Sequence, residues 1–183
     1  MKKTKKETLW NIIKNLKYEI LYIILLFIFS FFFGLFLPEI GEGYVLKILE
    51  YIKTAVKGKN FIELFFIIFW NNFRSGFFAV IFGVIFLPVF ACIVNGYILG
   101  FVFGKAYENY GILEVLARLI PHGIFELPAF FIAFACGLKI GTGLFVGNIK
   151  KKYLNGLKVF LFVVIPLLII AAIIESALFF VFN

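Results

Sequence analysis

Long apolar runs alternate with short charged segments along this chain. The first run, residues 20–37, carries no charge and is about long enough to cross a bilayer. Pro38 follows it, and from Ser75 to Gly104 the chain again has no charged residue. Apolar stretches of this length predict helices that span a membrane, so the pattern indicates an all-α, polytopic membrane helix bundle.

The uncharged segment 75–104 determines the predicted number of spans. If it crossed the membrane once, the chain would have four spans and the lysines at 139, 150–152 and 158 would lie outside. If it turns near residues 88–96, there are five spans and these lysines lie inside, as the positive-inside rule favours. We therefore predict spans at residues 20–37, 75–92, 93–107, 121–138 and 157–182. Because each half of the run is short, four spans plus a re-entrant hairpin is the alternative.

The remaining segments fit a single transmembrane domain over residues 1–183. Residues 38–60 mix charges with apolar side chains at nearly helical spacing, which predicts an external amphipathic helix on the membrane surface. Residues 1–19 form a basic segment that the positive-inside rule places in the cytoplasm. Five crossings then put the C-terminus outside.

Composition supports a membrane protein and argues against nucleic-acid binding. The chain is 63% hydrophobic and 21% aromatic, and its mean hydropathy is +1.07. The net charge of +8 comes mainly from lysines beside apolar runs, which suit a cytoplasmic surface and its anionic lipids. Cys92 and Cys136 both lie within apolar runs and indicate no disulfide framework.

Glycines recur at every fourth residue in two places. On a helix this spacing makes a smooth stripe that lets another helix approach closely, which is a main source of attraction between helices in lipid. The stripes predict either packing within one chain or a contact between copies in a homo-oligomer. The glycines are Gly96, Gly100 and Gly104, and then Gly137 and Gly141.

Ionisable side chains inside a membrane are costly and point to function. His122 is the only histidine of the chain, and Glu126, four residues later, shares its helix face if Pro121 opens that helix. The pair could exchange a proton, bind a cation or hold a polar group of a partner, or it could be a structural network paired with Arg74. The five-span topology predicts a polar site in the outer leaflet with the members Asn71, Asn72, Arg74, His122, Glu126 and Glu175.

No catalytic set is recognisable in the sequence. A single histidine without a ligating cysteine pair cannot form the zinc site of a metalloprotease. The chain also lacks a Gly-x-Ser-x-Gly motif, a phosphate loop and a dinucleotide-binding fingerprint. We therefore expect no enzyme activity, no cofactor and no bound metal.

Several short motifs, in order, resemble the signature of the stage II sporulation protein M family. The resemblance runs from about Phe61 onward and is most specific at the segment Pro121–Pro128. It implies a small polytopic protein of the cell (cytoplasmic) membrane. The namesake of the family holds peptidoglycan-degrading partners at the membrane during engulfment, and many relatives occur in organisms that never sporulate. The residues that match are Asn71, Asn72, Asn95, Gly96, Pro121, His122, Gly123 and Glu126.

Two functions agree with these features. The first is a non-enzymatic scaffold that anchors membrane or envelope protein partners, in contact with membrane lipids and with no nucleic acid. The second is a small transporter, channel or lipid-handling protein that uses the intramembrane histidine, glutamates and arginine. A hydrated cavity containing those residues favours the second function, whereas a dry, fully paired cluster favours the first.

Overall fold

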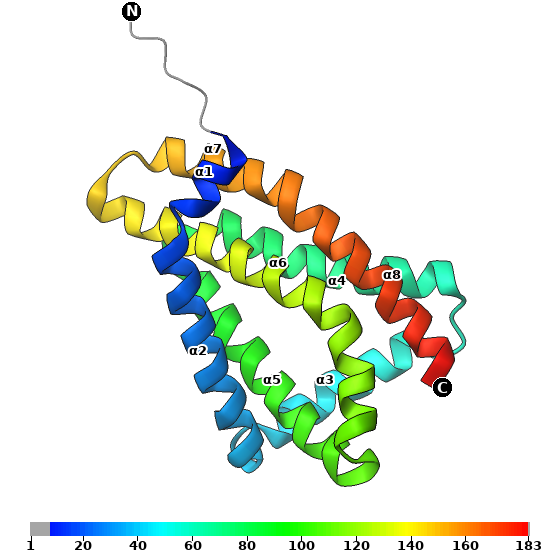
Figure 1. Cartoon of the computed structure of the whole chain (residues 1–183). Helices are drawn as coiled ribbons and strands as arrows, with labels where there is room; N and C mark the ends of the chain where they lie inside the picture. Colours follow the sequence, from blue (N-terminus) through cyan, green and yellow to red (C-terminus); the bar gives the residue numbers. More distant parts are fainter. Residues whose placement is uncertain (1–7, 183) are drawn as a thin grey trace, which may run out of the picture.

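The computed structural model describes residues 8–182, and every regular element in that range is a helix. Five helices are long and apolar enough to cross a membrane. The predicted all-α, five-span bundle is therefore confirmed (Figure 1). The spans are α2 (Lys17–Phe36), α4 (Phe61–Ile81), α5 (Leu87–Tyr110), α6 (Ile112–Val146) and a continuous helix over Ile149–Phe182.

The second and third spans differ from the prediction in their boundaries. The second begins at Phe61 instead of Ser75, where a capping box between Asn60 and Glu63 opens the helix. The turn lies at the 3-10 segment η2 (Gly83–Ile85), before the predicted turn at residues 88–96. With 21 and 24 residues, α4 and α5 are both long enough to span, so the re-entrant alternative is wrong.

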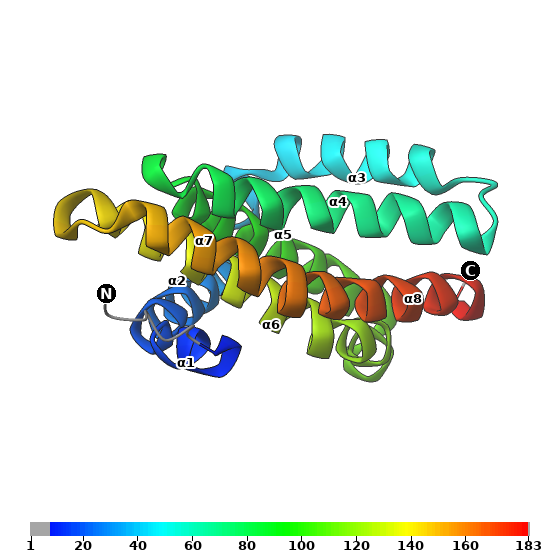
Figure 2. The same ribbon diagram turned by 90° about the horizontal axis from the view of Figure 1, so that it is seen from above.

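Shorter helices lie at the two ends of the bundle. At one end, α1 (Leu9–Lys14) packs beside α7 (Ile149–Val159). At the other end, η1 (Pro38–Ile40) leads into α3 (Glu42–Val56), the predicted amphipathic helix, which diverges from α4 on going away from the turn that joins the two helices (Figure 1 and Figure 2). The two ends of the described chain lie at opposite ends of the bundle, as an odd number of spans requires (Figure 1).

The helices α2 and α5 run in the same direction and pack backbone to backbone. A Cβ atom added at Gly100 would overlap the carbonyl of Phe31, and one added at Gly34 would overlap the carbonyl of Tyr97. Gly96 and Gly104 meet α2 one turn before and one turn after Gly100. This glycine stripe therefore packs within one chain, and ring contacts of Phe31 with Phe103 and of Phe33 with Tyr97 join the same two helices.

The long helix α6 passes through the centre of the bundle and contacts α2, α4, α5 and α8 (Ile165–Phe182). Added Cβ atoms at Gly137 and Gly141 would overlap the carbonyls of Ala79 and Gly83, so these glycines let α6 approach the end of α4 and η2. Helix α8 continues α7 through a short π-helix, Phe160–Val164, just before Pro166. At the α1 end, Lys139 of α6 pairs with Glu19 of α2 at 2.7 Å.

Candidate functional site

Three ionisable side chains that are far apart in sequence meet between α6 and α8. His122 and Glu126 lie one turn apart on α6, and Glu175 lies on the neighbouring α8. One donor atom from each residue lies within 4.8 Å of the other two. The helical spacing of His122 and Glu126 predicted that they share a face, and α8 adds a second carboxyl group to it.

Pro121 does not open this helix, as the sequence suggested. The helix begins nine residues earlier, at Ile112, so Pro121 and Pro128 both lie inside it. Proline has no N–H to donate, so each leaves a carbonyl one turn earlier without its usual helical partner. The His122–Glu126 pair thus sits between two weakened turns of a continuous helix.

The cluster carries unpaired polar groups. Among residues 8–182, no lysine or arginine forms an ion pair with Glu126 or Glu175. Nδ1 of His122 is buried without a hydrogen-bond partner, although the backbone of Arg118 approaches the ring. Arg118 itself pairs with Glu114 and stacks against Tyr110 and Phe182. Buried polar groups are nearly always paired in proteins, so this cluster stands out.

The cluster opens onto a cavity of about 650 Å³ between α2, α5, α6 and α8. A volume of this size falls within the range of small-molecule sites, which are mostly apolar with a few placed polar groups. The polar lining consists of Asn95, His122, Glu126 and Glu175, and the remaining walls are apolar. Two lining residues of α6, Ile120 and Ile124, are also exposed on the outside of the bundle. The cavity therefore combines mainly apolar walls with one cluster of ionisable side chains.

The polar residues of α4 do not join the cluster. Asn71, Asn72 and Arg74 lie within this span instead of before it, and none of them lines the cavity. Asn72 is buried, whereas Asn71 and Arg74 are exposed on the surface of α4. The alternative in which Arg74 forms an ion pair with Glu126 is not found, because no ion pair of Arg74 occurs among the described residues. The expectation failed because it began the second span at Ser75, whereas α4 begins at Phe61 and contains all three polar residues.

Sequence reasoning left Asn95 out of the site. Asn95 faces the cavity from α5, and its amide donates to the carbonyl of Ala91 at 2.7 Å. A signal was present, because Asn95 is the only amide side chain in the uncharged run 75–104. The apolar walls, among them Phe27, Phe31 and Phe103, carried no comparable signal in a chain with 28 phenylalanines.

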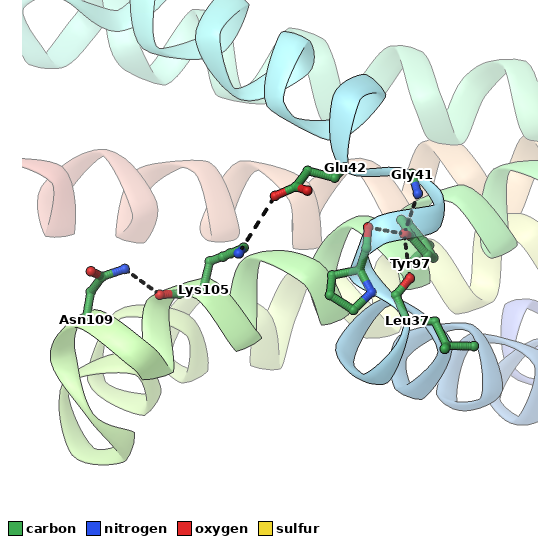
Figure 3. A network of polar contacts seen from close by, with 7 residues as sticks. Leu37, Gly41, Glu42, Tyr97, Lys105 and Asn109 are labelled. Atoms are coloured by element: carbon green, nitrogen blue, oxygen red, sulfur yellow. Dashed lines mark hydrogen bonds and ion pairs between the residues drawn. The ribbon is translucent and has the colours of Figure 1, made fainter.

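A separate polar network fixes the end of α2 against α5 (Figure 3). The hydroxyl of Tyr97 accepts from the N–H of Gly41 at 2.8 Å and lies 3.0 and 2.9 Å from the carbonyls of Leu37 and Pro38. Nearby, Lys105 of α5 lies 3.8 Å from a carboxyl oxygen of Glu42. These contacts hold η1 and the start of α3, and they are satisfied within the chain, unlike the His122 cluster.

The cluster can accept a cation, exchange protons or bind a polar head group. Two carboxyl groups with no positive partner repel each other when both are ionised, and a low-dielectric surrounding strengthens that repulsion. An imidazole beside them offers a nitrogen lone pair as well as a proton. Any of these uses requires access, which the cavity supplies.

Comparison with known proteins agrees with the motifs found in the sequence. The family model described as Stage II sporulation protein M matches residues 23–178, which include most of the first and last spans, the three spans between them and the His122 cluster. Neither the curated proteins nor the solved structures contain a match to this chain. On the strength of the family match, this multi-pass membrane protein belongs to the stage II sporulation protein M family.

Proposed function

We propose that this protein is a non-enzymatic membrane protein that binds an amphiphilic molecule in the cavity between α2, α5, α6 and α8, as a lipid-handling protein or small transporter does. The observation that carries the proposal is the form of the cavity. The cavity has a volume of about 650 Å³, its walls are mainly apolar, and the ionisable groups in its lining are gathered in one cluster. This is the arrangement that the sequence associated with transport or lipid handling instead of a paired structural cluster.

The chemistry of the lining selects the ligand. Apolar side chains from α2, α5 and α6 would contact an acyl or similar chain, gaining about 0.8 kcal/mol per buried CH₂ group relative to water. His122, Glu126 and Glu175 would contact the head group. Entry from the side is consistent with Ile120 and Ile124, which belong both to the cavity lining and to the outer surface.

Filling the cavity tests the proposal. Gly123 lines the cavity, and an added Cβ atom there would meet nothing within 4 Å. Gly123→Phe should therefore fold but lose any lipid that the wild type retains through detergent exchange, measured by native mass spectrometry. Gly43→Phe, at an equally open glycine on α3, is the matched control. Equal lipid retention by wild type and Gly123→Phe, or none by the wild type, contradicts the proposal.

A scaffold function is the second candidate, and the exposed polar face of α4 favours it. Arg74 and Asn71 are three residues apart within a candidate span and are exposed together. Polar groups that face lipid are costly, so a partner helix carrying an acidic residue would stabilise this face. A photocrosslinker at Asn71 should give a discrete adduct in native membranes that Arg74→Leu abolishes. A crosslinker at Phe29, which is 69% exposed on α2, is the control, and no Arg74-dependent adduct would refute the scaffold.

The proposed orientation places the N-terminus in the cytoplasm and the C-terminus outside. Lys139 and Lys150 to Lys152 lie at the end of α6 and the start of α7, and Lys14 and Lys17 lie at the start of α2, which α6 contacts through the Glu19–Lys139 ion pair. In a variant lacking Cys92 and Cys136, an impermeant thiol reagent applied to intact cells should label Lys57→Cys but not Lys151→Cys. The reverse labelling would invert the topology.

A further inference from the structure

The ionisable cluster in the cavity lining has the composition of a metal site. His122 supplies an imidazole, and Glu126 and Glu175 supply carboxylates, all within 4.8 Å of one another. Zinc is bound by the same donor types, and sites with three protein ligands keep a position open for a further ligand. Around a tetrahedral zinc with bonds of about 2.1 Å, ligand atoms lie about 3.4 Å apart, so small side-chain rotations would close the difference.

Charge balance supports a doubly charged ion. If both carboxyl groups ionised, they would place two negative charges without a positive partner in an apolar region, and a divalent cation would neutralise both. No described lysine or arginine does so. The nearest arginine along α6, Arg118, is already paired with Glu114.

The histidine indicates which class of metal the cluster would take. Mg²⁺ and Ca²⁺ prefer oxygen ligands alone, whereas imidazole suits first-row transition metals such as zinc. The buried Nδ1 of His122 has no hydrogen-bond partner, and one of the two ring nitrogens lies within 4.8 Å of both carboxyl groups as a ligand atom. This unpaired nitrogen is independent of the two carboxylates and distinguishes the cluster from a simple acidic pair.

We propose that His122, Glu126 and Glu175 bind one divalent transition-metal ion, whose open coordination position faces the cavity. This revises the expectation from sequence that the chain binds no metal. The bound ion would turn an acidic cluster into a receptor for an anionic head group, such as the phosphate or carboxylate of a lipid. This head-group preference rests on the proposed function, whereas metal binding itself does not.

The single histidine makes a direct test possible. The purified protein, with any affinity tag removed and Cys92 and Cys136 replaced by alanine, would be labelled at histidine with ¹⁵N and titrated with Zn²⁺. Its one imidazole resonance pair should shift with a stoichiometry of one ion per chain. Glu126→Gln combined with Glu175→Gln removes two ligands and should weaken binding at least about 100-fold. Loss of a residue that only hydrogen-bonds to a metal ligand already costs about 10- to 100-fold in metal affinity. Glu114→Gln, on the same helix but paired with Arg118, should bind like the wild type.

The outcomes separate the metal site from the proposed function. An imidazole signal that Zn²⁺ leaves unshifted, or equal affinity in the double variant, overturns the metal site even if a lipid is retained in the cavity. Zinc binding by a wild type that retains no lipid supports the metal site and contradicts the lipid-handling function. In the presence of Zn²⁺, dodecanoic acid should bind more tightly than dodecylamine, and the opposite preference refutes the anionic head group.

Discussion

The two faces of α5 differ in how closely they are packed. On one face, Gly96, Gly100 and Gly104 bring α5 against the backbone of α2. On the other face, large apolar residues such as Leu99 and Val102 line a cavity that they do not fill. One helix therefore forms both a rigid contact and the wall of a binding site, depending on which side chains its period of 3.6 residues presents to each neighbour.

The two faces also differ in how their polar groups are satisfied. Towards α2, the hydroxyl of Ser30 donates to the carbonyl of Ile93, and Sγ of Cys92 lies 3.4 Å from the carbonyl of Ile23. Towards the cavity, Nδ1 of His122 has no partner, and Glu126 and Glu175 have no cation among the described residues. Unsatisfied groups cost stability and persist where binding requires them, so the difference separates the structural half of the bundle from the functional half.

The largest expected effect lies on the close-packed face. Gly100→Ala adds one methyl group that would overlap the Phe31 carbonyl, a backbone atom that cannot move aside easily. We expect a loss of about 2 to 3 kcal/mol in the free energy of unfolding, at the upper end for overpacking. Thermal unfolding in detergent measures it. Gly123→Ala, which faces open space, should be neutral or stabilising, and equal losses in both variants would mean that the contact between α2 and α5 is packed no more closely than the cavity lining.

On the cavity face, removal of a charge should raise stability. Glu126→Gln eliminates one of two facing carboxylates, so we expect a gain of about 1 to 2 kcal/mol with a metal chelator present. Glu19→Gln is the matched control, because Glu19 pairs with Lys139 and its loss should cost about 1 to 2 kcal/mol, between the values for surface and buried pairs. If Glu126→Gln is destabilising by as much as Glu19→Gln, a counter-ion outside the described contacts must be present.

The smallest effect is expected at the end of the close-packed face. Tyr97→Phe removes the shorter of the two hydrogen bonds made by the N–H of Gly41 and leaves its bond to the carbonyl of Pro38 at 3.3 Å. It also removes the contacts of the hydroxyl with Leu37 and Pro38, so we expect a cost of about 0.5 to 1 kcal/mol. Hydrogen exchange at Gly41 should quicken while the core of α6 stays protected. An unchanged exchange rate at Gly41 would mean that the bond to Pro38 is enough to hold η1.

The sequence predicted the helical class and the five spans because apolar runs and lysine placement determine both. It also placed His122 and Glu126 on one face through their spacing alone. It misplaced the second span because Asn71, Asn72 and Arg74 interrupt an apolar stretch, and a few polar residues do not prevent a helix from being long and apolar enough to span. The ion pair between Arg74 and Glu126 failed as a consequence, since α4 presents Arg74 to its exposed side.

The contact of Glu175 with the cluster required tertiary structure. Several alignments of α8 against α6 agree with the sequence, and only the packing of the two helices brings Glu175, and not a neighbouring position, beside Glu126. The cavity could not be predicted from the sequence either, because its size depends on the distance of α6 from α2 and α5. The sequence does not show which of the 28 phenylalanines line the cavity and which lie on the outer surface of the bundle.

The parallel pair of α2 and α5 has a consequence for biosynthesis. Hydrogen bonds between α2 or its end and α5 join residues that are 60 to 69 positions apart in the chain. At about 5 to 20 residues per second, synthesis of the intervening chain takes roughly 3 to 14 seconds. During that interval α2 lies in the bilayer without α5, and Ser30 and Gly34 face lipid or an insertion factor. A nascent chain halted before residue 87 would therefore present an open groove on α2 to other membrane helices.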